Sequence, residues 1–225
     1  MKKITVLLVD DHTVVRQGLR ALLKTEEDIE VIGEAENGRQ AVALARKTPP
    51  DVVVMDVAMP LLNGLEATRQ ILKSMPSTKV LVLTSYSDDE CVEQLMRAGA
   101  AGYLIKQTAA NELLKAIREV QRGNAFFSPS IAKRLRDHCR EAFTTGQPSR
   151  RAGELTSREF EVLQLIAEGF SNKQIAGELS ISIKTVEKHR QQVMNKLNIH
   201  DVAGLTRYAL SKGMVERAIP AAAAG

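Results

Sequence analysis

Short apolar runs alternate with amphipathic stretches through the first 125 residues. Each of the four strongest runs ends at polar residues, and a weaker run, Glu30–Ile32, lies between the first two. The four strong runs are Leu7–Val9, Val52–Met55, Val80–Leu83 and Tyr103–Ile105. Such short runs predict strands, and runs that are apolar throughout are typical of strands covered on both faces. Five strands, each followed by a helix, predict an α/β fold with a doubly wound parallel sheet.

Apolar residues recur at helical spacing after each predicted strand. After the first strand these residues are Val15, Leu19 and Leu22. Further helices are predicted near residues 39–47, 65–74, 88–98 and 109–122. We therefore place a first domain at residues 1–125.

The remaining residues show helical periodicity and no strand pattern. Residues 126–152 are expected to form a linker helix and a flexible hinge, because residues 144–153 are polar and contain glycine and proline. Four helices near residues 157–168, 172–179, 183–197 and 202–211 predict a small all-α domain at residues 153–217. Two capping boxes, Thr156 with Glu159 and Ser171 with Gln174, begin the first two of these helices. The tail, residues 218–225, is expected to be disordered.

Polar side chains stand where the strong apolar runs end. Asp10 and Asp11 follow the first run and Asp56 follows the second, while Thr84 and Lys106 follow the other two. Because the carboxyl ends of parallel strands meet at one edge of a sheet, these side chains are expected to form one site. Three carboxylates, a hydroxyl and an ammonium suit a divalent metal together with a phosphoryl group.

Each of these groups has a role in such a site. Asp11 and Asp56 are candidate Mg²⁺ ligands, with Asp10 binding directly or through water and the Ala58 backbone carbonyl supplying a further oxygen. Lys106 would balance negative charge. Thr84 would donate a hydrogen bond to a phosphoryl oxygen on Asp56.

These motifs resemble the receiver domain of two-component response regulators, which has a flavodoxin-like fold. The resemblance covers roughly residues 3–122 and is carried by Leu8–His12, Asp56–Pro60 with Gly64, Thr84–Ser85 and Gly102–Lys106. It implies that Asp56 accepts a phosphoryl group from the histidine of a sensor kinase, and that Asp10 and Asp11 bind Mg²⁺. Thr84 and Tyr103 would form the switch that answers phosphorylation. An alternative for Tyr103 is an edge-strand aromatic that half covers the core.

The sequence departs from the receiver pattern directly after Lys106. Many receivers have a proline there, whereas this chain has Gln107. A cis bond before a residue other than proline costs about 3 kcal/mol. By the same resemblance, Ala58 and Tyr86 occupy positions that tune the lifetime of the phosphoryl group.

Charge is unevenly distributed between the two halves of the chain. The net charge is +4, but residues 1–125 hold 16 basic and 17 acidic side chains, whereas residues 126–225 hold 15 and 10. The basic excess favours a polyanionic partner for the second half.

On the helix at 183–197, one stripe is basic and amide-bearing, as a helix in the DNA major groove requires. Its members are Lys184, Lys188, Gln191 and Asn195, opposite an apolar stripe of Ile183, Val186, Val193 and Leu197. The alternative is a solvated helix face.

Residues 151–215 resemble a LuxR-type helix-turn-helix DNA-binding domain. The matching stretches are Leu155–Leu163, Ser171–Ala176, Lys184–His189 and Met194–Leu197. The resemblance places Lys184, Thr185, Glu187, Lys188 and Gln191 in the major groove. His189 is interpreted as a packing or phosphate-contacting residue, and the helix at 202–211 as a dimer contact.

Composition sets limits on location. No apolar run approaches the roughly 20 residues that span a bilayer. The N-terminus does not have the pattern of a signal peptide. Cys91 and Cys139 do not form a metal-spaced pair and are interpreted as plain thiols. These features favour a cytoplasmic protein with no membrane partner.

The two resemblances together imply a response regulator of the NarL/FixJ group, which regulates transcription and is not an enzyme acting on an outside substrate. Its expected partners are a sensor histidine kinase, double-stranded promoter DNA, a second copy of itself when phosphorylated, and RNA polymerase as a further candidate.

Two alternative functions stay open. The first is a regulator that uses the receiver only for dimerisation, independently of phosphorylation. The second is a Mg²⁺-dependent phosphohydrolase, which is disfavoured because Ala58 stands where a general acid would be needed. A nucleotide-binding enzyme is less favoured still, because the first strand is not followed by a glycine-rich loop.

Overall fold

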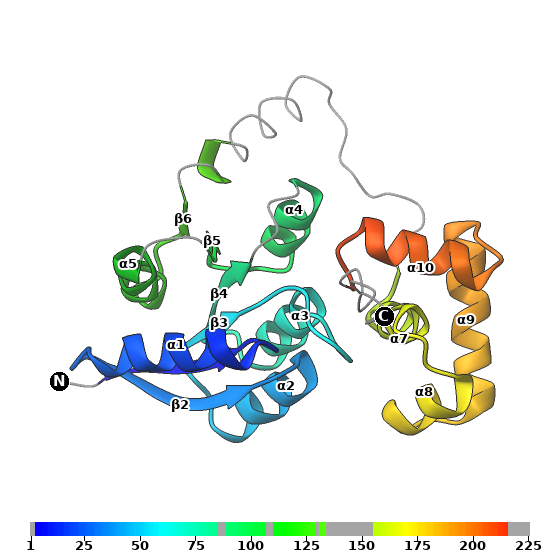
Figure 1. Ribbon diagram of the computed structural model, residues 1–225, viewed down its shortest axis with the longest axis horizontal. Helices are drawn as coiled ribbons and strands as arrows, with labels where there is room; N and C mark the ends of the chain where they lie inside the picture. Colours follow the sequence, from blue (N-terminus) through cyan, green and yellow to red (C-terminus); the bar gives the residue numbers. More distant parts are fainter. Residues whose placement is uncertain (1–2, 85–88, 107–109, 129–130, 134–154, 216–225) are drawn as a thin grey trace, which may run out of the picture. The chain divides into compact units, whose positions relative to one another are not determined.

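The computed structural model describes residues 3–84, 89–106, 110–128, 131–133 and 155–215. The chain divides into two compact units, Met1–Glu154 and Leu155–Gly225. The first contains the sheet, and the second consists of helices in its described part (Figure 1).

The first unit is built on a parallel sheet in the order β2-β1-β3-β4-β5-β6. The strands are β1 (Ile4–Val9), β2 (Ile29–Ala35), β3 (Val52–Met55), β4 (Lys79–Thr84), β5 (Gly102–Ile105) and β6 (Phe126–Phe127). Every residue of β3 is buried. This matches the prediction from its uninterrupted apolar run, because helices cover both faces of the sheet.

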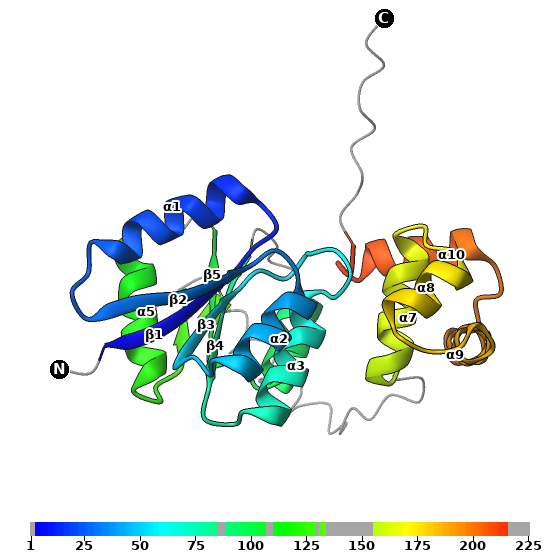
Figure 2. The ribbon, with the colours of Figure 1, turned by 90° about the horizontal axis from the view of Figure 1, so that it is seen from below.

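Two layers of helices enclose the sheet (Figure 2). Helices α1 (Thr13–Lys24) and α5 (Ala110–Gln121) lie on one face, while α2 (Gly38–Lys47) and α3 (Gly64–Ser74) lie on the other, with α4 (Asp89–Arg97) packed beside α3. Alternate strand residues supply each layer. Leu8, Val54 and Leu104, for example, join Ile117 and Val120 of α5 in one apolar cluster. The predicted α/β fold class is therefore confirmed.

The sheet differs from the predicted one in two places. Strand β2 extends to Ala35, beyond the predicted Glu30–Ile32, and β6 adds a sixth parallel strand beside β5. Phe126 and Phe127 fall in the stretch expected to be linker. Two residues are too few for periodicity to indicate a strand, so β6 depends on its pairing with Gly102 and Tyr103.

The described part of the expected linker helix covers residues 131–133, with Ile131 fully buried. The rest of that helix, the hinge at 144–153 and the tail at 218–225 lie outside the described residues.

The second unit contains α7 (Ser157–Ala167), α8 (Asn172–Glu178), α9 (Ile183–Leu197) and α10 (Val202–Ser211). Both predicted capping boxes are present, at Thr156 with Glu159 and at Ser171 with Gln174. Helix α7 packs against each of the other three helices, and all of its residues from Glu159 to Ile166 are buried. A helix buried all round its circumference forms the centre of such a bundle. In the described part of the chain, no helix has both the length and the apolar character needed to cross a bilayer.

Candidate functional site

The predicted polar residues converge at the carboxyl edge of the sheet. Strand register explains why: Val9 of β1 pairs with Met55 of β3, so the next residues, Asp10 and Asp56, are neighbours. The backbone confirms this alignment, because the Asp56 amide donates to the Val9 carbonyl over 2.8 Å. On the other side, the Lys106 amide donates to the Thr84 carbonyl over 2.8 Å.

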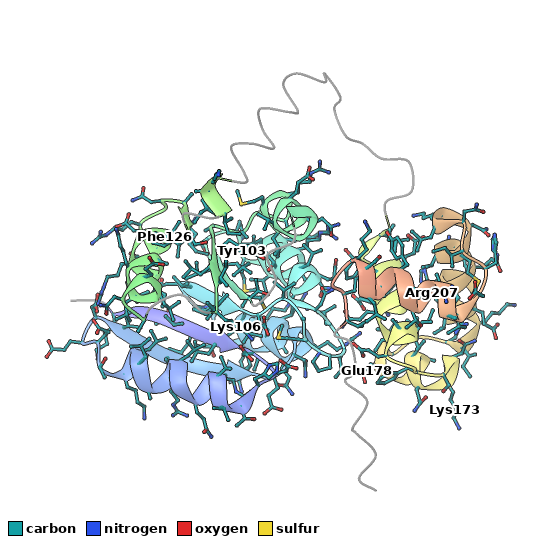
Figure 3. The ribbon with its side chains drawn as sticks, turned by 45° about the horizontal axis from the view of Figure 1, so that its top comes forward. Tyr103, Lys106, Phe126, Lys173, Glu178 and Arg207 are labelled. Atoms are coloured by element: carbon teal, nitrogen blue, oxygen red, sulfur yellow. The ribbon has the colours of Figure 1, made fainter. Side chains whose placement is uncertain are left out.

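Lys106 connects the two buried carboxylates. Its Nζ lies 2.8 Å from Asp10 Oδ2 and 2.7 Å from Asp56 Oδ2. The exposed fractions of Asp10 and Asp56 are only 2% and 4%. Lys106 follows the fully buried Tyr103 and Leu104 along β5, and Figure 3 labels Tyr103 and Lys106 within this unit. A buried acid–ammonium cluster of this kind is costly to desolvate, which favours a chemical role over a purely structural one.

Burial changes the acidity of these groups. Burial raises the pKa of Asp56 to about 6, against the opposing effect of the hydrogen bond and charge of Lys106. The nearby Asp10 adds to the increase. Burial would lower the pKa of Lys106, but its hydrogen bonds to Asp10 and Asp56 raise it instead. Lys106 is therefore charged at neutral pH, and Asp56 is ionised at a free-energy cost.

A group of possible metal-ligand atoms lies beside the pair formed by Asp56 and Lys106. Ligand atoms of Asp10, Asp11, His12 and Asp56 all lie within 4.8 Å of one another. Asp11 Oδ1 is shielded from solvent, yet among the described residues no group donates a hydrogen bond to it. It lies 2.8 Å from His12 Nδ1, at ion-pair distance but without hydrogen-bond geometry. Enclosed carboxylate oxygens that lack donors suit a hard divalent cation.

His12, for which the sequence predicted no role, also lies at this site. Its backbone amide donates to Asp10 Oδ1 over 2.8 Å, and its Nδ1 lies 3.3 Å from the same oxygen. Only its position next to two aspartates could have suggested this placement. His12 is exposed, so it forms the outer edge of the acidic cluster.

The loop after β3 folds tightly against Asp56. Ala58 is buried in this loop. The Gly64 amide donates to the Val57 carbonyl over 2.8 Å. A Cβ atom at Gly64 would lie 1.9 Å from the Asp56 carbonyl oxygen, so any other residue there would force the loop away. Gly64 therefore keeps the start of α3 against the backbone of Asp56.

The two expected switch residues are both enclosed. Thr84 has an exposed fraction of 0% and Tyr103 of 1%. The alternative of a half-covering edge-strand aromatic is wrong for Tyr103, because β6 pairs with β5 and removes it from the sheet edge. Tyr86 and Gln107 lie outside the described residues.

Helix α9 separates a buried side from an exposed one. Val186 and Val193 are fully buried, whereas Lys184, Lys188, Gln191 and Asn195 are all exposed, as predicted. Glu187 is exposed and Thr185 is half-buried. The predicted apolar stripe is wrong at one position: Ile183 is 45% exposed, because α9 begins there, after its Ser182 cap and at the end of the bundle. His189 is half-buried, with its Nδ1 enclosed and without a described hydrogen-bond partner.

Polar contacts tie α9 and α8 to the central helix. Lys196 Nζ lies 2.6 Å from Glu159 Oε2, and the same carboxylate oxygen accepts the Thr156 amide at the start of α7. Burial would raise the pKa of Glu159, but the hydrogen bonds from Lys196 and Thr156 outweigh it and lower that pKa. Arg158 Nη2 donates to the Leu179 carbonyl, where α8 ends. These contacts join both α8 and α9 to the start of α7.

Comparison with known families connects both sites to one class of protein. A model of the response regulator receiver domain matches residues 6–118, and a model of the luxR family of bacterial regulatory proteins matches residues 153–209. The chain belongs to the LuxR-type response regulators. It is a two-component transcription regulator that joins a receiver domain to a helix-turn-helix DNA-binding domain.

Relatives of this response regulator cover between 61% and 95% of its length. The response regulator protein VraR of Staphylococcus aureus is 38% identical over 213 residues, which cover 95% of this chain and 99% of VraR. Among solved structures, a LuxR-family two-component regulator from Aurantimonas sp. SI85-9A1 is 34% identical with a TM-score of 0.59, covering 61% of this chain and 99% of that one. A structure of the two-component regulator RcsB in complex with DNA is 28% identical, with a TM-score of 0.57, and covers 94% of this chain and 99% of that one.

Proposed function

We propose that this response regulator is switched by phosphorylation of Asp56 and that the phosphorylated form binds promoter DNA in a sequence-specific manner. A sensor histidine kinase would supply the phosphoryl group. An oxygen of the Asp56 carboxylate attacks the phosphorus, a new P–O bond forms, and the P–N bond to the kinase histidine breaks with its electron pair left on nitrogen. The observation that carries this proposal is the buried Asp56 carboxylate, 2.7 Å from the Lys106 ammonium.

The donor set around Asp56 fits Mg²⁺. Asp10, Asp11 and Asp56 would hold the ion with the backbone carbonyl of Ala58, and Asp11 Oδ1 supports this assignment because it is enclosed and accepts no hydrogen bond from any residue that the structure describes. When bound, Mg²⁺ supplies charge neutralisation at the phosphoryl oxygens. Lys106 contributes a fixed positive charge next to the attacking carboxylate. Because Lys106 also pairs with Asp10, it orients both acids.

Thr84 and Tyr103 are proposed to convert the new charge at Asp56 into a change of shape. Thr84 ends β4 at the same sheet edge and would donate its hydroxyl to a phosphoryl oxygen. Tyr103 is already buried. In this proposal phosphorylation stabilises that inward position and changes the surface formed by α4, β5 and α5.

The output is proposed to be DNA binding through α9. Lys184, Thr185, Glu187, Lys188 and Gln191 would enter the major groove, where lysine and amide side chains read base edges or contact phosphates. The RcsB relatives support this, since three of those structures are described as RcsB bound to DNA, and one of the three as two RcsB dimers on two parallel DNAs. A homodimer on paired half-sites is the proposed bound form, with RNA polymerase as a further partner. We place this action in the cytoplasm.

Phosphoryl-group labelling tests the acceptor. In the presence of Mg²⁺, a small phosphodonor should add one phosphoryl group to the wild-type chain and none to Asp56→Asn. Asp28→Asn is the matched control, because Asp28 is a surface carboxylate that pairs with Arg118 and precedes β2, away from the carboxyl edge of the sheet. This variant should be labelled normally. Labelling of Asp56→Asn would disprove the assignment.

DNA affinity with and without the phosphodonor tests the switch. Tighter binding to a selected DNA site only when Asp56 is phosphorylated is expected. Equal affinity in both states would favour the alternative regulator that uses its receiver only for dimerisation. Turnover of a generic phosphate ester would favour the phosphohydrolase.

A further inference from the structure

Arg16 is a buried cation next to the acidic site that takes no direct part in the proposed chemistry. It lies in the first turn of α1, with an exposed fraction of 6%. Its Nη1 donates to the backbone carbonyl of Asp10 over 2.7 Å. Its Nη2 lies 2.9 Å from Glu36 Oε1, and its Nε lies 3.3 Å from Glu34 Oε2. One guanidinium therefore connects the end of β1 to the segment that ends β2.

The Asp10 carbonyl is an informative partner because of where it lies. It belongs to the peptide unit that joins Asp10 to Asp11, and a peptide unit is planar. Fixing that oxygen fixes the orientation of the whole unit, and with it the position of the Asp11 Cα from which that side chain leaves the backbone. The Asp10 amide is held as well, by the Ala35 carbonyl at 3.1 Å. The Asp10 amide is therefore anchored to β2, and the Asp10 carbonyl is anchored to Arg16.

The charge of Arg16 is largely offset by its partners. Glu34 and Glu36 both contact it, while Arg20 provides a second cation for Glu34 at 2.7 Å. If the charge of Arg16 dominated, it would repel a divalent cation, and its removal would tighten metal binding. If its hydrogen bond dominates, removal would let the Asp10–Asp11 turn move and would weaken metal binding. The two effects have opposite signs, so a single measurement separates them.

We propose that Arg16 is a positioning residue that orients Asp10 and Asp11 for divalent-cation binding, and thereby for phosphorylation of Asp56. This inference rests on the proposed function. Groups that orient metal ligands without touching the metal commonly change its affinity by about 10- to 100-fold when they are removed. Arginine suits this position because its planar fork can serve a carbonyl and two carboxylates at once, which a lysine ammonium does not do at this span.

The test is the Kd for Mg²⁺ of the full chain, measured by titration calorimetry. Arg16→Met keeps much of the side-chain volume but removes all donors, and its Kd should be about 10-fold above that of the wild type. Arg16→Lys should show a smaller increase of about threefold, because one ammonium cannot hold both strands. Glu36→Gln is the matched control: it removes the negative charge of an exposed partner of the same guanidinium, leaves the Asp10 contact, and should bind Mg²⁺ as the wild type does.

Urea unfolding of each variant separates positioning from loss of stability. Ile117→Val, a change on the buried face of α5, should lower stability without changing the Kd. An unchanged or lower Kd in folded Arg16→Met would overturn the proposal, and if that variant does not fold, a wild-type Kd in Arg16→Lys would do so. Failure of the wild-type chain to bind Mg²⁺, or labelling of Asp56→Asn, would instead count against the proposed function itself.

Discussion

The two units of this response regulator use charged side chains in opposite ways. In the receiver, Asp10, Asp56 and Lys106 lie inside the protein at the end of a sheet, with the lysine Nζ within 2.8 Å of one oxygen of each acid. In the helical unit, Lys184 and Lys188 stand exposed on α9. A group that undergoes chemistry gains from burial, because a low dielectric strengthens its interactions and changes its pKa. A group that recognises DNA must instead reach a partner outside the protein.

The same contrast applies to stability. Ionising Asp56 in the receiver costs stability, since burial opposes the charged form of this carboxylate. The ion pair between Glu159 and Lys196 in the helical unit contributes stability, because its hydrogen bonds outweigh the cost of burial. Four expected outcomes would sharpen or break this comparison.

The largest effect is expected in the core of the helical unit. Leu163 of α7 is fully buried. Leu163→Ala should lower the free energy of unfolding of this unit by about 2–5 kcal/mol, because it removes buried methyl groups and leaves a cavity. Urea unfolding followed separately in each unit provides the measurement. A matching loss in the receiver would contradict the expectation that the two units unfold separately. The control is Val202→Ala, at an exposed position of α10, which should change stability by less than about 0.5 kcal/mol.

A functional acid of the receiver should be replaceable with a gain in stability. In Mg²⁺-free buffer at pH 7, Asp56→Asn should raise the free energy of unfolding by about 1–3 kcal/mol, because the buried carboxylate no longer has to be ionised. A carboxyl whose pKa is raised by folding loses stability as the pH increases from its unfolded value of 3.8 to its folded value of about 6. The gain should therefore be full above pH 6 and disappear near pH 4. Destabilisation of the Asn variant at pH 7 would break the comparison.

An exposed charge on α9 should affect binding and leave folding unchanged. Lys188→Ala should weaken DNA binding by about 1–3 kcal/mol if Lys188 reads a base. If Lys188 contacts a phosphate, the variant should instead reduce the slope of log affinity against log salt concentration by about 1. Its unfolding midpoint should match the wild type, since surface changes are usually neutral. Lys24→Ala, on α1 of the receiver, is the control. Unchanged DNA affinity in Lys188→Ala would mean that this face of α9 is only solvated.

The smallest effect is expected at the ion pair of the helical unit. Glu159→Gln should destabilise this unit by up to about 1 kcal/mol at neutral pH. Because folding lowers the pKa of Glu159, its contribution is present above the unfolded value of 4.5 and is lost as the pH falls through the folded value. Wild type and Glu159→Gln should therefore converge in stability as the pH falls below the folded pKa of Glu159, which lies under 4.5. A difference that persists there would assign the effect to the amide substitution itself.

The sheet-edge site was predictable because it depends on where strands end. Each apolar run stops at the residue that the register then brings to the edge, so Asp10 and Asp56 could be placed together without coordinates. The helix starts of the second unit were predictable for a similar reason, since capping boxes are local in sequence. Arg16 could not be found in this way. It appears as one basic residue on an amphipathic helix, and its partners Glu34 and Glu36 are about 20 residues away.

The amino-acid sequence by itself determined the parallel α/β architecture, the succession of its predicted strands along the chain and the identity of the acids at their ends. It could do so because hydrophobic periodicity and strand polarity are local properties. Only the tertiary structure decided that β6 covers β5, that Tyr103 is buried, and that His12 and Arg16 frame the aspartates. The physical reason is that burial and pairing of these residues depend on segments distant in the chain, whose approach is governed by packing rather than by any short-range pattern.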